Sequence, residues 1–508
     1  MTEKSSNNKR IAKNSITLYF RMSIAMFIGL YTSRIVLQEL GLIDYGIYEV
    51  VGGVVSMFGF LNSTLSAGSQ RFITYALGTG NNNKVRSTFS TAFNIHLLLS
   101  IIIGILVISV GTYMVYEKLV IPTEKISDAY FTLCTCSIIA VLTISQAPFT
   151  GLIIAHEKMN VYAYISLIEI VLKLCIAFIL TIGGENKLKL YAFLMALVQI
   201  IIYLLYRAYC KKSFKDYKIS RHIDWQLAKE IGTFSGWNII GSLSNILSVQ
   251  GLGIIFNMFF GPVINTAQGL SNKINSFCSQ FISSFQSAIN PQIVKYYASK
   301  QKEEMLHLVY NNIRLSGMMI LLIVVPVFIE INFLLDLWLE HYPKETLLFS
   351  RVVLIQAIIM AIYNPLVTSI FATGKMKVPN ILAGGTQLLI LPTAYVMLHY
   401  NIALQWILIV SLLPWILASF IDLCLLKRYI GMSILSYYRN SYMIIIPSGT
   451  IMYAVSYIPS LYMEQGLLRL ICTSILSTLT GSILAYKFTL TPTMRSLLIT
   501  KLKEIFKK

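Results

Sequence analysis

Long apolar segments alternate with short polar segments along the whole chain. The apolar segments are about 18 to 27 residues long, which lets a helix cross roughly 30 Å of hydrocarbon. Their apolar residues are continuous and do not alternate with polar ones, so the pattern favours helices over the strands of a closed barrel. We therefore expect an all-α, polytopic membrane protein.

The pattern predicts about 14 transmembrane helices. A cleavable signal peptide is the alternative for the first segment. That segment is long, contains Arg21 and Arg34 and lacks a small-residue cleavage site, so we expect an uncleaved helix. The predicted segments are 15–38, 46–68, 88–113, 128–152, 161–182, 190–207, 233–257, 264–289, 311–333, 347–371, 379–398, 402–425, 442–461 and 467–488.

Two short echoes suggest an internal duplication. Ser66-Ala67, followed by Tyr75, recurs 221 residues later as Ser287-Ala288, followed by Tyr296. A glycine-containing turn, at Gly41 or Gly261, and a mostly apolar segment precede each copy. Pro148 recurs as Pro365, and each proline is followed ten residues later by Lys-Met. Because the two echoes have nearly the same offset, they predict a doubled unit of roughly 220 residues.

The most basic part of the chain, residues 207–230, separates two predicted sets of six helices, and a final pair follows them. We expect an N-terminal six-helix bundle (1–210), a basic cytoplasmic linker (211–230), a pseudo-symmetric C-terminal six-helix bundle (231–427) and a segment with two helices and a cytoplasmic tail (428–508). Repeats that share one orientation are related by an axis along the membrane normal. Facing halves leave a central crevice, which predicts a transport pathway. A bundle that is only a scaffold is the alternative.

Composition supports a membrane protein, because 56% of the residues are hydrophobic and only 12% are charged. The net charge of +19 also fits a nucleic-acid-binding protein, but the Lys and Arg residues lie mostly in loops, so we expect no nucleic-acid partner. The seven Cys and six His residues are scattered and show no metal-ligand spacing. We expect no metal, no cofactor and no catalytic residue.

The distribution of Lys and Arg predicts the orientation in the membrane. With a cytoplasmic N-terminus, 29 of them fall on the cytoplasmic side. We therefore expect both termini in the cytoplasm. The opposite side receives six, which are Lys118, Lys125, Lys187, Lys189, Lys344 and Arg469.

Several charged residues fall inside the predicted helices. An ionised side chain that faces lipid at mid-depth costs at least about 2.5–3.5 kcal/mol, so the deep ones should face protein or water. Arg21 and Lys273 lie deep and are the first candidates for binding an anionic ligand, because Arg and Lys are the usual partners of phosphate. The predicted substrate-binding residues are Arg21, Arg34, Glu49, Lys173 and Lys273.

Some of the charged residues in the predicted helices also have a purely structural interpretation. Lys173 lies one helical turn after Glu169, and an ion pair between the two is the alternative to a binding role. Arg34 lies near a helix end and can reach the membrane interface with its long side chain. Arg314, Arg351 and Asp422 are expected to do so as well.

The stretches Tyr31–Arg34 and Asp44–Tyr48, the turn Leu40-Gly41 and the stretch Ser287–Gln292 resemble the multidrug/oligosaccharidyl-lipid/polysaccharide exporter (MOP) superfamily. Within it, the chain resembles polysaccharide-biosynthesis flippases of the Wzx type. The resemblance covers nearly the whole chain. It implies alternating access and a cationic cavity lined largely by the first, second, seventh and eighth helices.

In relatives that flip a lipid-linked peptidoglycan precursor, Arg residues of the first helix and a cation of the eighth serve the diphosphate. Arg21, Arg34 and Lys273 lie in comparable helices but are not matched position by position. Cation-coupled drug exporters of the superfamily use buried acids, notably in the first or seventh helix. Here residues 231–256 contain no acid, although Glu49 or Glu169 can substitute.

These observations predict a flippase that moves an oligosaccharide linked to undecaprenyl diphosphate across the bacterial inner membrane. The expected partners are the membrane, this lipid-linked oligosaccharide and a polysaccharide polymerase machinery. A cation-coupled multidrug exporter of the MATE type is the alternative. A membrane glycosyltransferase or polymerase is disfavoured, because the longest predicted outer loop, 114–127, is too short to form a domain.

Overall fold

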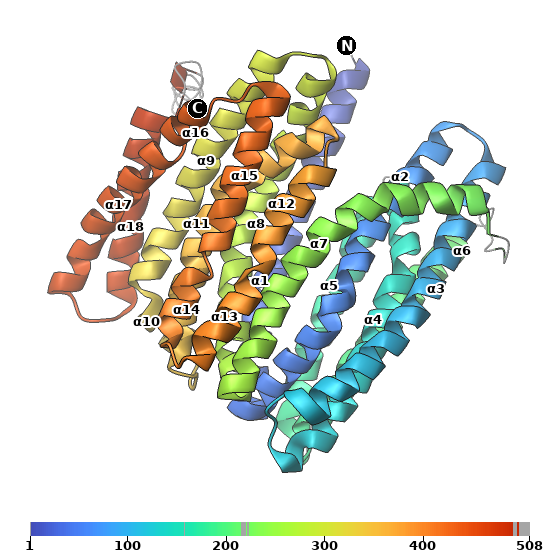
Figure 1. The fold of residues 1–508 in the computed structure, drawn as a ribbon, viewed down its shortest axis with the longest axis horizontal. Coiled ribbons are helices and arrows are strands. Elements are labelled where there is room, and N and C mark those ends of the chain that lie inside the picture. Colours follow the sequence, from blue (N-terminus) through green and yellow to red (C-terminus); the bar gives the residue numbers. More distant parts are fainter. Residues whose placement is uncertain (1, 157, 215–219, 221–222, 491–494, 497–508) are drawn as a thin grey trace. The chain divides into compact units, whose positions relative to one another are not determined.

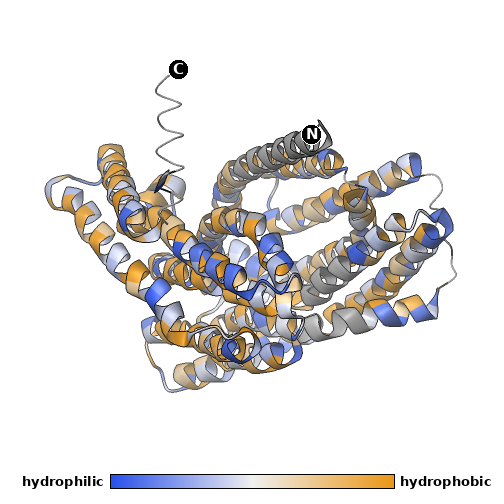
Figure 2. Cartoon of the chain, turned by 90° about the horizontal axis from the view of Figure 1, so that it is seen from above, coloured by the Kyte–Doolittle hydropathy of each residue, from blue (hydrophilic) through white to orange (hydrophobic). Residues whose placement is uncertain are grey.

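The structure is a computed structural model that describes residues 2–156, 158–214, 220, 223–490 and 495–496. Within these ranges, the side chains at 2–23, 25, 59–68, 233–240 and 288 are not described. The described residues are helical almost throughout and include no β-strand. Figure 2 shows hydrophobic residues along the helices and many hydrophilic residues at the connections, as a polytopic all-α membrane protein requires.

The chain forms two compact units. Unit 1 comprises Met1–Gly269 with His341–Pro343, and unit 2 comprises Leu270–Glu340 with Lys344–Lys508. The boundary falls inside the long helix α8 (Pro262–Ala298). The predicted division into six-helix bundles at residues 211–230 stays a prediction.

Unit 1 is built around α4, which contacts α1, α2, α3, α5 and α6 (Figure 1). Ile47, Leu133 and Ile153 are fully buried in its core. The long helices of this unit are α1 (Thr2–Ser56), α2 (Phe60–Gly78), α3 (Asn82–Tyr113), α4 (Ile126–Ala155), α5 (Met159–Ile182), α6 (Lys187–Ser213) and α7 (Trp225–Phe260).

Unit 2 is built around α9, which contacts α10, α11, α16, α17 and α18. In Figure 1, α17 and α18 lie side by side at its edge. Its helices after α8 are α9 (Lys302–Ile329), α10 (Ile331–Trp338), α11 (Glu345–Thr373), α12 (Lys377–Leu388), α13 (Ile390–His399), α14 (Leu404–Val410), α15 (Leu413–Ile430), α16 (Ile434–Asn440), α17 (Tyr442–Tyr462) and α18 (Leu467–Leu484).

The two predicted echoes coincide with structural features. Gly41 interrupts α1 with φ 72° and ψ 175°, and Gly261 separates α7 from α8 with φ 74° and ψ −170°. Such positive φ angles suit glycine, which has no Cβ. Pro148 lies inside α4 and Pro365 inside α11, and in each case the helix ends shortly afterwards.

Every predicted transmembrane segment is helical over most of its length. Among the described residues, twelve helices are long and apolar enough to cross a membrane. One of these spans, Met26–Ser56, includes the interruption at Gly41, so it contains parts of two predicted helices. The helix α8 is not among the twelve, because it is rich in Ser, Asn and Gln.

Candidate functional site

One face of α8 is polar over several turns. Ser276, Gln280, Ser283 and Ser287 are exposed, and Lys273 is half-buried one turn before Ser276. With 3.6 residues per turn, positions three, four and seven residues apart lie on the same side of a helix. We call these five residues the α8 polar face.

Hydrogen bonds fix the rotation of α8 within unit 2. Gln286, which is buried at the edge of the polar face, donates from Nε2 to the Ala361 carbonyl at 2.9 Å and to Ser316 Oγ at 3.1 Å. On the opposite side of the helix, the buried Ser271 hydroxyl donates to the Thr346 carbonyl at 3.2 Å. Because the side with Ser271 lies in the core of unit 2, the polar face points out of that core.

The α8 polar face is unsuited to contact with lipid. The Ser276 and Ser287 hydroxyls donate to the Asn272 and Ser284 carbonyls of the same helix, at 2.8 and 2.7 Å, so the cost of lipid contact comes from the other groups. An amide such as that of Gln280 loses of order 2–7 kcal/mol when it enters hydrocarbon without a hydrogen-bond partner. A charged Lys273 at depth is also costly there. In a membrane-spanning helix such a face belongs against water or other polar groups.

Arg34 lies on α1 in unit 1 and is half-buried. Phe27 and Tyr31, which precede it by seven and three residues, are exposed on the same side of the helix. The Tyr31 ring also contacts Phe178 of α5, with ring centroids 6.3 Å apart. The side chain of Arg21 lies outside the described residues. Arg34 and Lys273 thus belong to different units.

Glu49 lies on the second part of α1, against the first turns of α8. A Cβ at Gly269 would meet its Cδ at 2.7 Å and its Oε2 at 3.0 Å. Tyr45, Tyr191 and Cys136 are close enough to interact with the carboxylate. Glu49 is therefore half-buried among these groups, and glycine at position 269 provides the space for it.

Lys173 and Glu169 form an ion pair along α5, with Nζ 2.6 Å from Oε1. This confirms the structural interpretation of Lys173, whose charge is balanced on its own helix. Both side chains remain partly exposed, at 40% and 32%. A role of Lys173 in substrate binding stays a prediction.

The predicted outer loops of unit 1 are joined by ion pairs. Lys125 Nζ lies 2.9 Å from Asp44 Oδ2, and Lys189 Nζ lies 2.9 Å from Asp128 Oδ1. Lys187 bonds Glu39 in the same region. These contacts bring three loops together at one end of the unit. The charge count assigns all three loops to the same side of the membrane.

The structure overturns the prediction for Asp422. This carboxylate does not reach the membrane interface: it is only 3% exposed and accepts a 2.7 Å hydrogen bond from the Tyr363 hydroxyl. The reason is that α15 packs against α11, which supplies the donor. Arg351 is half-buried, with its guanidinium 5.9 Å from the centroid of the Phe328 ring.

A buried ion pair that the sequence did not reveal joins α18 to the junction of α9 and α10. Arg469 donates from Nε to Glu330 Oε1 at 3.0 Å and from a terminal nitrogen to Oε2 at 2.7 Å. The Thr473 hydroxyl also donates to Glu330, at 3.1 Å. Glu330 has no exposed surface. An acid and an arginine at the ends of two apolar segments were the only signal of this pair.

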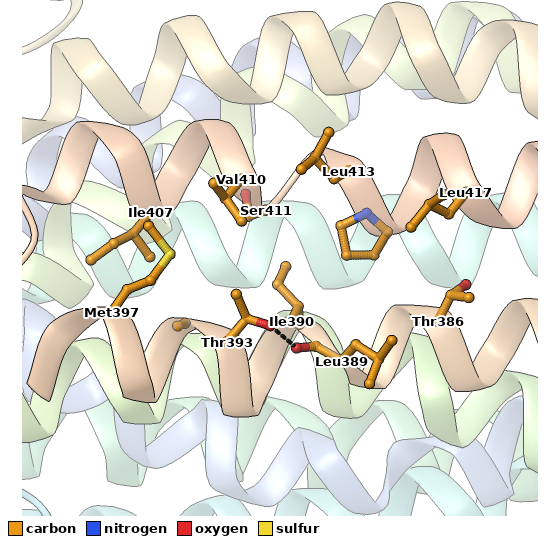
Figure 3. Close-up of a pocket in the computed structure, with 12 residues that line it drawn as sticks. Thr386, Leu389, Ile390, Thr393, Met397, Ile407, Val410, Ser411, Leu413 and Leu417 are labelled. Carbon is orange, nitrogen blue, oxygen red and sulfur yellow. Dashed lines mark hydrogen bonds between the residues drawn. The ribbon is translucent and has the colours of Figure 1, made fainter. Parts of the chain in front are cut away.

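An apolar pocket of about 200 Å³ lies where two helices of unit 2 are broken. Leu389 separates α12 from α13, and Ser411-Leu412 separates α14 from α15. Figure 3 shows Leu389, Ile390 and Met397 on one side and Ile407, Val410 and Leu413 on the other. The Thr393 hydroxyl donates to the Leu389 carbonyl at 2.7 Å, so this polar group is satisfied within its own helix.

Within the part of the chain that the structure describes, no group of three His, Cys, Asp or Glu side chains is placed to hold a metal ion. The described chemistry therefore consists of charged side chains within the helices and a polar helix face. Such groups can bind a polar or charged ligand.

No protein-family model matches the chain, and no curated protein sequence matches it. Solved structures do match. Lipid II flippase MurJ, in an inward closed conformation, has a TM-score of 0.69 and 11% identity, and the match covers 94% of this chain and 98% of the flippase.

Two MATE transporters match over less of the chain. A mutant of the Vibrio cholerae MATE transporter VcmN has a TM-score of 0.59 and 15% identity, covering 86% of this chain and 100% of that one. An inward-facing multidrug resistance MATE family transporter of the MOP superfamily has a TM-score of 0.57 and 16% identity, covering 82% and 98%. The chain thus has the fold of MOP-superfamily transporters.

Proposed function

We propose that this protein moves a lipid-diphosphate-linked oligosaccharide across the bacterial inner membrane by alternating access. The cargo is the repeat unit of an O-antigen, capsule or exopolysaccharide, carried on undecaprenyl diphosphate. The observation that carries the proposal is the α8 polar face with Lys273. Sugar and diphosphate cannot cross hydrocarbon unaided, because their polar groups lose hydrogen bonds to water there. A polar face with a cation replaces those bonds.

The charges of the predicted helices favour an anionic cargo. Arg21, Arg34 and Lys273 are cations, and Arg and Lys form strong, charge-assisted hydrogen bonds with phosphate oxygens. A membrane potential that is negative inside also assists the export of an anion, by about 2.3 kcal/mol per charge per 100 mV. The proposed binding residues are therefore these three cations together with Glu49 and Lys173.

The structural likeness supports the same proposal. The lipid II flippase matches this chain over 94% of its length, whereas the two MATE transporters match over 86% and 82%. The fold common to these proteins suits alternating access between two bundles. In the proposed arrangement both termini are cytoplasmic, and a polysaccharide polymerase receives the exported cargo.

A cation-coupled multidrug exporter of the MATE type is the second candidate. The observation in its favour is Glu49, a carboxylate within a predicted membrane helix and close to Tyr45 and Tyr191. A carboxylate in such a place can bind a proton or a metal cation. This candidate predicts transport of cationic dyes driven by a proton or sodium gradient.

The test removes the charge at Lys273. The purified protein is reconstituted in liposomes with a fluorescent short-chain polyprenyl diphosphate that carries one N-acetylglucosamine, and its movement between leaflets is followed by chemical quenching. Loss of a charge-assisted contact of about 1.5–3 kcal/mol predicts that Lys273→Gln slows movement tenfold or more.

Lys295→Gln is the matched control for Lys273→Gln. It makes the same change on the same helix, but beyond the predicted membrane segment 264–289, and should keep the wild-type rate. Wild-type movement in both variants would contradict the assignment of Lys273.

A further inference from the structure

A second polar site lies in unit 2, outside the α8 polar face. It is an open pocket of about 550 Å³ formed by α9, α16 and the beginning of α17. A pocket of this size is within the range that holds small ligands. Its lining residues are Arg314, Ser436, Arg439, Asn440, Met443 and Ile444.

The pocket carries two positive charges, and none of its lining residues is acidic. Arg314 donates from a terminal nitrogen to Asn311 Oδ1 at 2.5 Å, while its Nε is buried without a hydrogen-bond partner. Arg439 is exposed and forms no ion pair with any described residue. The guanidinium group of Arg439 is therefore open to a ligand, and Arg314 can offer the terminal N–H groups that Asn311 does not accept.

The architecture around the pocket is held by local hydrogen bonds. The Tyr310 hydroxyl of α9 lies 3.4 Å from the Ser433 carbonyl, just before α16. The Ser433 side chain caps α16 by accepting from the Ser436 backbone N–H at 3.2 Å. The arginines thus project from two elements that contact each other, which keeps their spacing defined.

The position of the pocket matches the level of lipid headgroups. Arg314 lies near the beginning of the predicted membrane segment 311–333, and Arg439 lies just before the segment 442–461. The charge count assigns both of these ends to the cytoplasmic side. Met443 and Ile444, which begin α17, supply an apolar wall on the membrane side.

We propose that this pocket binds a phosphate-bearing headgroup, with Arg314 and Arg439 on the phosphate oxygens. Guanidinium groups present paired N–H donors that match phosphate geometry. The Ser436 hydroxyl and the Asn440 side chain complete the polar lining. The lipid that carries the headgroup lies along α17. This site is separate from the α8 polar face, and the proposal does not depend on the transport function proposed for that face.

The test measures binding to the purified full-length protein by native mass spectrometry in detergent. The probes are dioctanoyl phosphatidic acid, dioctanoylglycerol with the same chains and no phosphate, inorganic phosphate and pyrophosphate. Phosphatidic acid should bind, and the double substitution Arg314→Gln with Arg439→Gln should weaken its binding at least tenfold. The matched control is Arg428→Gln. Arg428 is exposed and is assigned by the charge count to the same cytoplasmic side, but it does not line the pocket.

The remaining probes identify the source of the phosphate. Competition by inorganic phosphate or pyrophosphate at equal strength means that the pocket takes a free phosphate. If phosphatidic acid stays bound in the presence of both phosphates, the pocket takes a lipid headgroup. Arg439→Lys, which keeps the charge but loses the paired donors, should bind with intermediate strength.

Equal binding of dioctanoylglycerol, unchanged binding by the double variant, or equal loss in Arg428→Gln would overturn the proposal. Circular dichroism and elution volume of each variant show whether it is folded. A failure of transport in the Lys273→Gln experiment leaves this result unaffected, because binding here is measured without transport.

Discussion

At the scale of single residues, Gly46 lies so close to the backbone of α8 that no side chain fits there. A Cβ at Gly46 of α1 would lie 1.9 Å from the carbonyl oxygen and 2.6 Å from the carbonyl carbon of Pro262, the first residue of α8. Both of these atoms belong to the backbone, which cannot rotate away as a side chain can. The turn around Gly41 and the beginning of α8 therefore depend on the absence of a side chain at position 46.

Gly46→Ala should destabilise the protein by about 1–3 kcal/mol or more, the usual cost of overpacking. Thermal unfolding of the purified protein in detergent measures the loss. Gly52→Ala is the matched control on the same helix, because a Cβ there meets no atom within 4 Å. It should be neutral or slightly stabilising, since alanine favours helices. Equal unfolding temperatures for Gly46→Ala and the wild type would contradict the packing described here.

The sequence predicted contacts between residues that are close along the chain, but not contacts between residues that are far apart. The ion pair of Glu169 and Lys173 was predictable, because a helix brings positions four apart together. The bond from Tyr363 to Asp422 spans 59 residues, and no local periodicity indicates it. Asp422 was therefore wrongly expected at the membrane interface.

At the scale of elements, α8 is the helix whose surroundings matter most to the proposed function. A thiol on its polar face should react with a membrane-impermeant reagent, because a thiol ionises in water and not in lipid. In a protein whose seven native cysteines are replaced, Ser276→Cys, Gln280→Cys and Ser287→Cys should be modified in intact cells.

Phe281→Cys provides the control for this labelling. Phe281 is 43% exposed, but it lies on a different side of α8 from the polar face. Its thiol should react at least tenfold more slowly, since the apolar side faces hydrocarbon. Equal reactivity at Phe281→Cys and Gln280→Cys would mean that the polar face lines no aqueous path.

The pair of Arg469 and Glu330 determines how α18 is held against α9 and α10. Arg469→Leu leaves the fully buried Glu330 without its cation and should cost about 3–5 kcal/mol in the free energy of unfolding. The double variant Glu330→Leu with Arg469→Leu should lose much less, because both charges are removed. Thermal unfolding in detergent checks both, and a double variant as unstable as the sum of the single variants would refute an ion-pair role.

Helix type followed directly from hydropathy, whereas helix breaks did not. The segments 442–461 and 467–488 agree closely with α17 (Tyr442–Tyr462) and α18 (Leu467–Leu484). The segments 379–398 and 402–425 are each divided into two helices. These breaks occur within apolar sequence, so hydropathy gave no sign of them, although Pro392 and Pro414 lie in the first turns of α13 and α15.

At the scale of the whole molecule, the predicted internal duplication agrees with local features of the structure and stays a prediction. Gly41 and Gly261 have nearly the same backbone conformation, and Pro148 and Pro365 each lie inside a helix that ends shortly afterwards. The sequence predicted the helices that contain these residues and identified the charged residues within them. It did not predict which side of α8 is buried, because that depends on Gln286 and its partners on α9 and α11.

The proposed function is the movement of a lipid-diphosphate-linked oligosaccharide from one leaflet to the other. The most direct measurement compares two substrates in liposomes that contain the wild-type protein: the short-chain polyprenyl diphosphate with N-acetylglucosamine, and the cationic dye ethidium. We predict that the diphosphate lipid changes leaflet and that ethidium does not move, with or without a proton or sodium gradient. Gradient-driven movement of ethidium, together with a stationary diphosphate lipid, would contradict the account.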